Sequence, residues 1–170
     1  MWIGSIRLIV ETKNAPDAGT DSLVQATILR NGGSLALLNL DYPTENDLER
    51  GAIRNYDYIG PTKQPRRNDQ TPELPSGVGQ NPMPYPGYGF EFSNGMNGHL
   101  QIRLQIRGDD MWIKDNVDLY VRLIRRRATS FDTLAWIEDS DWTYIASWGR
   151  DVAMSTDSGE GVTTWTLNLN

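Results

Sequence analysis

The sequence predicts an all-β fold, an antiparallel two-sheet β-sandwich formed by a single domain over residues 1–170. Apolar residues alternate with polar residues at a period of two through most of the chain, as in strands with one buried face. No segment has the longer period of a helix, and turn residues separate about eight strand-like runs. A length of 170 residues suits one such domain.

The first half of the chain predicts three strands. Alternating apolar residues indicate strands at residues 6–10 and 23–30. A third apolar run at 35–40 follows Asn31-Gly32-Gly33, which supplies the positive-φ residues of a tight turn. We expect the runs at 23–30 and 35–40 to pair as a hairpin.

The second half contains the clearest alternation. Residues 99–107 place Leu and Ile at every second position, with Gln and Arg between them. The same pattern occurs at 117–123 and at 164–169. Each pattern predicts a strand with one face in the core.

Residues 61–90 differ in composition from the rest of the chain. Seven of the nine prolines lie there, and aliphatic residues are few. A loop this long is uncommon in a compact domain, so we expect a long Pro/Gly-rich insertion. It is either a loosely packed surface segment or an adhesive arm, with Tyr85 and Tyr88 contacting a partner.

Composition excludes several classes of function. The net charge of −6 argues against nucleic acid as a partner. The absence of cysteine excludes thiolate chemistry, and His99 is the single histidine. Since the sequence has no Gly-x-Ser-x-Gly, phosphate-loop or dinucleotide motif, we expect no enzyme.

The N-terminus lacks the pattern of a signal peptide, and no apolar stretch is long enough to span a membrane. These features predict a cytoplasmic protein if Met1 is the native start. Use of calcium would favour an extracellular setting.

Acidic residues gather in three expected loops, at 11–22, 44–51 and 107–112. The first loop offers Asp17, Asp21 and the Thr20 hydroxyl, which are oxygen ligands of the kind that Ca²⁺ prefers. A sandwich brings alternate loops together at one end, where a cation would relieve repulsion between carboxylates. The alternative is that these residues are solvated loop tips.

Four segments together resemble one family. They are Ala-Gly-Thr-Asp-Ser-Leu-Val at 18–24, Asn-Asp-Leu-Glu-Arg-Gly at 46–51, the strand, acidic loop and Trp-Ile-Lys-Asp-Asn-Val of 104–117, and the closing segment 148–167. In order and spacing they resemble the PLAT domains of lipoxygenases, polycystins and alpha-toxins, over about residues 2–60 and 90–169.

The resemblance implies a sandwich of two four-stranded sheets that binds membranes or proteins, with Ca²⁺ at the loop end in several members. By position it implies seven calcium-site residues: Gly19, Thr20, Asp21, Asn46, Asp47, Asp109 and Asp110. Met111 and Trp112 adjoin these acids, and the resemblance implies that they contact lipid or a partner. The alternative for Trp112 is packing within the sandwich.

Two further predictions concern partners. Arg125, Arg126 and Arg127 form the densest basic run, which either contacts an anionic surface or is a solvated strand end. The sequence therefore favours a non-catalytic binding module that recognises a membrane surface or a protein, with Ca²⁺ as its cofactor. The alternative is a structural subunit of a homo-oligomer or larger assembly, which uses the 61–90 loop as an interlocking arm.

Overall fold

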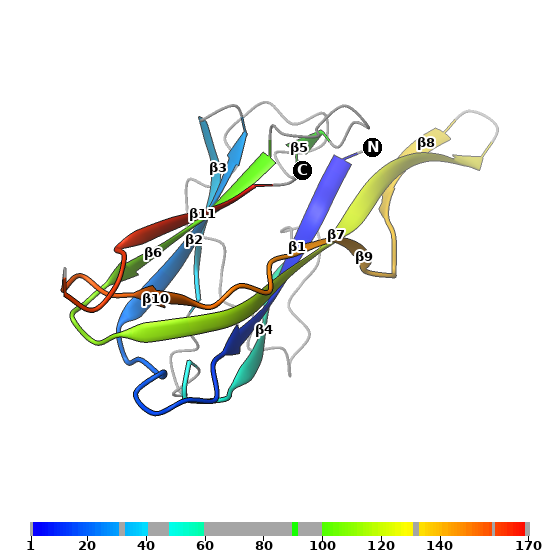
Figure 1. Cartoon of the computed structure of the whole chain (residues 1–170). Helices are drawn as coiled ribbons and strands as arrows, with labels where there is room; N and C mark the ends of the chain where they lie inside the picture. Colours follow the sequence, from blue (N-terminus) through cyan, green and yellow to red (C-terminus); the bar gives the residue numbers. More distant parts are fainter. Residues whose placement is uncertain are drawn as a thin grey trace.

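A computed structural model describes residues 2–30, 33–40, 48–59, 90–91, 100–130, 133–157 and 159–168. Within these ranges the chain forms strands and connections and no helix, and two antiparallel sheets face one another (Figure 1). The predicted β-sandwich is confirmed. The described part also has no helix with the length and hydrophobicity needed to cross a bilayer.

Eleven strands are formed by the described residues, more than the eight or so that the sequence predicts. They are β1 (Trp2–Thr12), β2 (Leu23–Arg30), β3 (Gly33–Asn39), β4 (Ile53–Ile59), β5 (Phe90–Glu91), β6 (Leu100–Arg107), β7 (Trp112–Ser130), β8 (Thr133–Glu138), β9 (Thr143–Ser147), β10 (Val152–Met154) and β11 (Thr164–Asn168).

The larger sheet is built around β1 and the 19-residue strand β7, which pair with each other. Three short strands share the other edge of β7, because β10, β9 and β8 pair with its residues 112–114, 118–121 and 124–130. Likewise β4 and β5 pair with successive parts of β1. This sheet therefore contains seven strands, where the resemblance implies four, although it is four strands across.

The smaller sheet has four strands in the order β11-β6-β2-β3. The pairing of β2 with β3 confirms the predicted hairpin. Strand β6 is the central strand with the strictest alternation, and it pairs with β2 on one edge and β11 on the other.

The core lies between the two sheets and follows the alternation of the sequence. Leu8 and Val10 of β1 face Val24 and Ala26 of β2, and all four side chains are fully buried. The core of β7 changes phase, because Trp112 and Lys114 are buried at even positions and Val117 to Leu123 at odd positions. A register shift in the pairing of β7 with β1 accounts for the change.

Several predicted residues lie outside the described ranges: Asn46, Asp47, Tyr85, Tyr88 and the 61–90 loop up to Gly89. The backbone of Arg125, Arg126 and Arg127 belongs to β7 and pairs with β8. Their side chains are not described, so their contact with a partner stays a prediction.

Candidate binding site at the loop end

Four connections meet at one end of the sandwich, which we call the loop end: residues 13–22, 48–52, 108–111 and 155–163. Figure 1 shows this end at the lower left, where β1 turns into β2 and β6 turns into β7. Backbone hydrogen bonds join the connections. The Thr20 amide donates to the Leu48 carbonyl at 3.1 Å, and the Thr156 amide donates to the Gly108 carbonyl at 3.1 Å.

Two glycines allow these connections to approach closely. A Cβ atom on Gly19 would lie 2.8 Å from the Arg50 backbone nitrogen, and one on Gly108 would lie 2.2 Å from Ser22 Oγ. Gly108 also has a φ of 147°, which side chains other than glycine rarely adopt. Because neither glycine has a side chain, the loops can pack at this short spacing.

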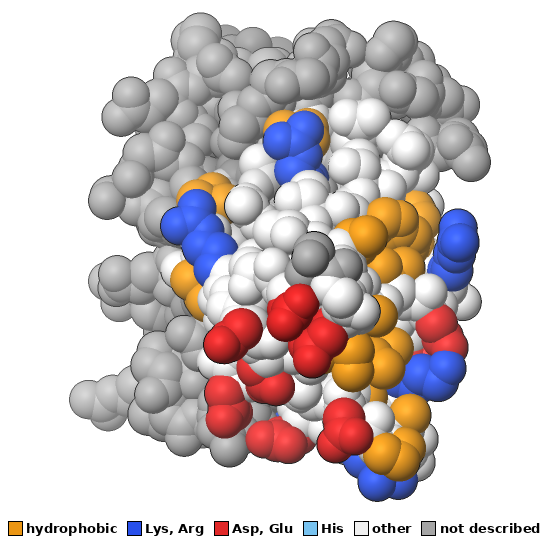
Figure 2. Space-filling view, turned by 60° about the vertical axis from the view of Figure 1, so that its left-hand side comes forward, with side chains coloured by type: hydrophobic (Ala, Val, Ile, Leu, Met, Phe, Trp, Pro, Cys, Tyr) orange, Lys and Arg blue, Asp and Glu red, His pale blue; other side chains and the backbone are white. Residues whose placement is uncertain are grey.

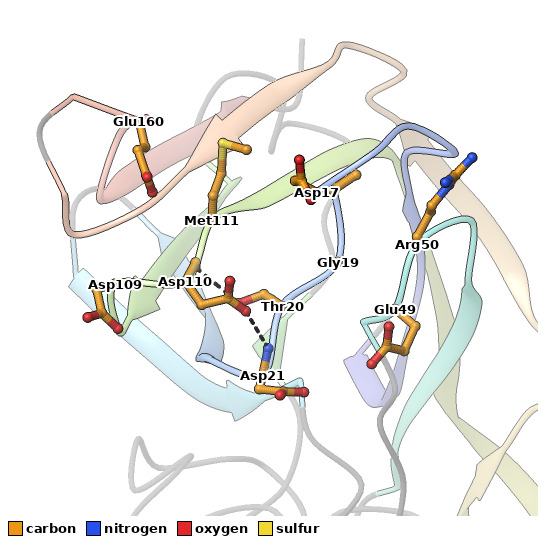
Figure 3. Close-up of a pocket in the computed structure, with 11 residues that line it drawn as sticks. Asp17, Gly19, Thr20, Asp21, Glu49, Arg50, Asp109, Asp110, Met111 and Glu160 are labelled. Carbon is orange, nitrogen blue, oxygen red and sulfur yellow. Dashed lines mark hydrogen bonds between the residues drawn. The ribbon is translucent and has the colours of Figure 1, made fainter.

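An open pocket of about 660 Å³ lies between the four connections. Its lining includes six carboxylates and one guanidinium: Asp17, Asp21, Glu49, Asp109, Asp110, Glu160 and Arg50. Figure 3 shows these side chains coming from separate loops around a common space, and Figure 2 shows acidic side chains gathered at one end of the molecule.

Two cations near the pocket, Arg50 and Lys13, have other partners. Arg50 Nε donates a hydrogen bond to Asn14 Oδ1 at 3.1 Å. Lys13 forms an ion pair with Asp151, whose hydrogen bond and charge raise the pKa of Lys13. Most of the negative charge of the pocket is therefore uncompensated by the residues that the structure describes.

Hydrogen bonds hold Thr20 and Asp110 in place. Thr20 Oγ1 donates to the Asp110 carbonyl at 3.1 Å and accepts from the Ser22 amide at 3.0 Å. The Asp110 carboxylate accepts from the Asp21 amide at 2.9 Å, as the dashed lines in Figure 3 indicate. The Asp21 and Asp109 side chains are exposed at the pocket, with no hydrogen bond to another described group.

The donors fit Ca²⁺ in kind, since the lining residues offer carboxylate, hydroxyl and backbone oxygens, include no histidine or cysteine, and hold sulfur only in the Met111 thioether. They do not form a closed ligand shell. Within the described ranges, no three acidic or histidine side chains lie close enough together to hold one metal ion.

The pocket contains five of the seven predicted calcium-site residues, namely Gly19, Thr20, Asp21, Asp109 and Asp110. Their role as metal ligands stays a prediction. Met111 lines the same pocket, whereas Glu49, Arg50 and Glu160 join it without having been predicted. Glu160 lies in the acidic and glycine-rich turn of the closing segment, which is the signal that could have identified it.

Trp112 corrects one expectation. Its side chain is fully buried in the core, and its Nε1 donates a hydrogen bond to Thr12 Oγ1 at 3.0 Å. The indole therefore packs within the sandwich and does not contact a membrane or partner. The acidic loop before it turns inward at Trp112, because the Ile113 amide donates to the Ala18 carbonyl at 2.9 Å.

No protein-family model and no curated protein sequence matches the chain. Among solved structures, the chain is similar to a crystallised LOX variant, with 16% identity, a TM-score of 0.46 and coverage of 98% of this chain and 16% of that one. It is similar to coral 8R-lipoxygenase, described as having calcium activation via a C2-like domain, with 18% identity, a TM-score of 0.42 and coverage of 89% and 17%.

Alpha toxin from Clostridium absonum is a third similar structure, with 14% identity, a TM-score of 0.43 and coverage of 91% of this chain and 32% of the toxin. The chain thus spans 16% of the length of the LOX chain. At these identities and TM-scores, the similarities assign neither a family nor an activity to the chain.

Proposed function

We propose that the protein is a non-catalytic binding module whose acidic loop end binds Ca²⁺ and, through it, an anionic group of a membrane surface or a protein partner. The observation that carries the proposal is the gathering of six carboxylates from four connections around one pocket, opposite a single guanidinium. Six carboxylates that line one open pocket give it a negative potential, which a bound cation would lower.

The rigidity of the surrounding backbone supports the proposal. Gly19 packs tightly against the backbone at Arg50, Gly108 packs tightly against the Ser22 side chain, and Thr20 and Asp110 are held by hydrogen bonds. Asp21 and Asp109 remain exposed and free to turn toward an ion. A fixed frame with a few adjustable oxygens suits a cation that accepts six to eight ligands in flexible geometry.

Bound at the loop end, Ca²⁺ would neutralise the pocket and leave coordination positions for an anionic group. Asp21, Asp109 and Asp110 are the described side chains that would hold it, together with backbone carbonyls of the 13–22 connection. Without a cation, the acidic pocket would repel the phosphate and carboxylate groups of a membrane.

The first experiment compares the melting temperature in EDTA, in millimolar Ca²⁺ and in millimolar Mg²⁺. We expect a Ca²⁺-specific rise of several degrees, because a ligand at a hundred times its Kd stabilises the folded state by about 2.7 kcal/mol. The variant Asp21→Asn with Asp109→Asn should lose this rise. Asp141→Asn, which removes an exposed carboxylate outside the pocket, is the matched control and should keep it.

Equal melting temperatures in Ca²⁺ and EDTA would overturn the calcium part of the proposal. A rise that persists in the Asp21→Asn, Asp109→Asn variant would place the ion elsewhere. If the rise is specific, cosedimentation with vesicles of phosphatidylcholine and phosphatidylserine separates the two targets. Binding that requires Ca²⁺ would support a membrane surface as the target, and its absence would exclude an anionic surface of this composition and leave a protein partner as the proposal.

A further inference from the structure

The smaller sheet has an unusual charge. Strands β2, β3, β6 and β11 contain three arginines and no Asp or Glu at any position, in a chain whose net charge is −6. All acidic residues of the chain therefore lie outside these four strands. Above the acidic cluster in Figure 2, the visible described surface shows basic side chains but no acidic ones.

The outward face of β6, in the smaller sheet, is polar. Because Ile102, Leu104 and Ile106 of β6 point into the core, the alternate residues of β6 point outward. We call this surface the amide face and define it by Gln101, Arg103, Gln105 and Arg107 of β6 with Thr166 and Asn168 of β11. It has both donors and acceptors, and its only charged groups are guanidinium groups.

Two amides of this face bond to each other, and no ion pair to its two arginines is found among the described residues. Gln101 Nε2 donates to Asn168 Oδ1 at 2.7 Å across the β6–β11 pair. Arg103 and Arg107 are exposed, and neither makes an ion pair within the described part of the chain. They lie four residues apart on one strand, a separation of roughly 13 Å, and could contact two carboxylates of one partner.

We propose that the amide face binds the acidic loop end of a second copy of this chain. The loop end has six carboxylates against one guanidinium, so the two surfaces are complementary in charge and occur on the same chain. Because the amide face and the loop end are different surfaces, we take the contact as head-to-tail, with the loop end of one copy against the amide face of the next. The inference goes beyond the proposed function and needs no Ca²⁺.

Sedimentation velocity over a range of concentrations in EDTA tests this contact. We expect reversible association of the full chain that weakens between 0.1 M and 1 M NaCl, as the screening length falls from about 10 Å to about 3 Å. Arg103→Glu should weaken association about tenfold or more. Arg150→Glu reverses an exposed arginine outside both surfaces and is the matched control.

A mixing experiment decides the geometry. A variant with Arg103→Glu and Arg107→Glu and a variant with Asp21→Lys and Asp109→Lys should each be monomeric alone. Their mixture should form one-to-one dimers, since the first keeps an acidic loop end and the second keeps an amide face. Melting curves of both variants confirm that they fold.

Three results would overturn the proposal. A wild-type chain that stays monomeric at about millimolar concentration would exclude self-association. Association that survives Arg103→Glu would place the contact on another surface. Loss of association in both variants without recovery in the mixture would show that the two surfaces do not contact each other. These results do not depend on the calcium experiment, because Arg103 lies outside the pocket.

Discussion

Lys114 is a fully buried lysine in the core of a sandwich. Its Nζ donates to the carbonyls of Asp115 at 3.0 Å and Trp148 at 2.7 Å, and it lies 4.8 Å from the ring centroid of Trp165. Burial removes water from the ammonium group and lowers the pKa of Lys114 from 10.5 to about 8. The hydrogen bonds and the indole offset part of the cost of that burial.

The lowered pKa predicts a pH dependence of stability. Between pH 8 and 10.5 the unfolded chain binds more protons at this residue than the folded chain does. The contribution of Lys114 to the free energy of unfolding therefore rises with pH in this window, by roughly 2 kcal/mol between pH 7.5 and pH 10. Urea unfolding of the wild type and Lys114→Met at both values measures it.

Lys114→Met cannot titrate at this position, so it corrects for every other group that changes charge. The difference in unfolding free energy between wild type and variant should shift in favour of the wild type as pH rises. A difference that is the same at both pH values would contradict the lowered pKa.

At the scale of elements, the loop end depends on close backbone contact between the 13–22 and 48–52 connections. Gly19→Ala would force these connections apart, because its Cβ would lie 2.8 Å from a backbone atom. We expect it to destabilise the fold by about 1–3 kcal/mol, the usual cost of overpacking, and to weaken any Ca²⁺ response. Thermal and urea unfolding measure the first effect.

Gly149→Ala is the matched control for this prediction. Its Cβ would meet only Asn116 Oδ1 at 3.6 Å, an ordinary contact, so its stability should differ from wild type by less than about 1 kcal/mol. If both variants unfold alike, the close contact at Gly19 does not hold the loop end together.

Strand positions could be predicted from the sequence wherever a local pattern of residues determines them. The strict alternation of residues 99–107 became β6, and the two runs expected to form a hairpin pair as β2 and β3. The length of β7 and its three neighbours along one edge could not be predicted, because pairing between distant segments leaves no local pattern. The phase change at Lys114 was hidden for the same reason, since a bulge depends on the partner strand.

The sequence likewise predicted only some of the residues of the candidate site. Asp21 and Asp109 stand out because acids in loops are visible in a sequence, and sandwiches gather their loops at the ends. Glu160 has a signal in the sequence, the acidic and glycine-rich turn of the closing segment, whereas the place of Arg50 at the pocket follows only from the path of the chain. Trp112 looked like a surface residue because it adjoins acids, but the hydrogen bond to Thr12 and its burial come from packing that no local pattern encodes.

At the scale of the whole molecule, a net charge of −6 with six carboxylates around one pocket predicts a salt dependence. In EDTA, NaCl screens repulsion at the loop end, so the melting temperature should rise from low to moderate salt. A gain of up to about 1 kcal/mol would raise it by about 2–4 °C in a chain of this size. Differential scanning calorimetry measures the shift.

The variant Asp21→Asn with Asp109→Asn should show a smaller rise, because it has lost two of the repelling charges. Asp141→Asn should behave like the wild type. A melting temperature that falls with salt would mean that ion pairs such as Arg7 with Asp57 outweigh the repulsion.

The pairing of β1 with β7 has a consequence for synthesis on the ribosome. Strand β1 is made before β4 and can pair with it early, but its other edge pairs with residues 114–124, which are made much later. Until β7 emerges, half of the hydrogen-bonding groups of β1 have no partner strand. The larger sheet also lacks its longest strand, so this part of the core is not yet covered. Folding of the domain is therefore expected to be late and slow, limited by a contact between distant parts of the chain.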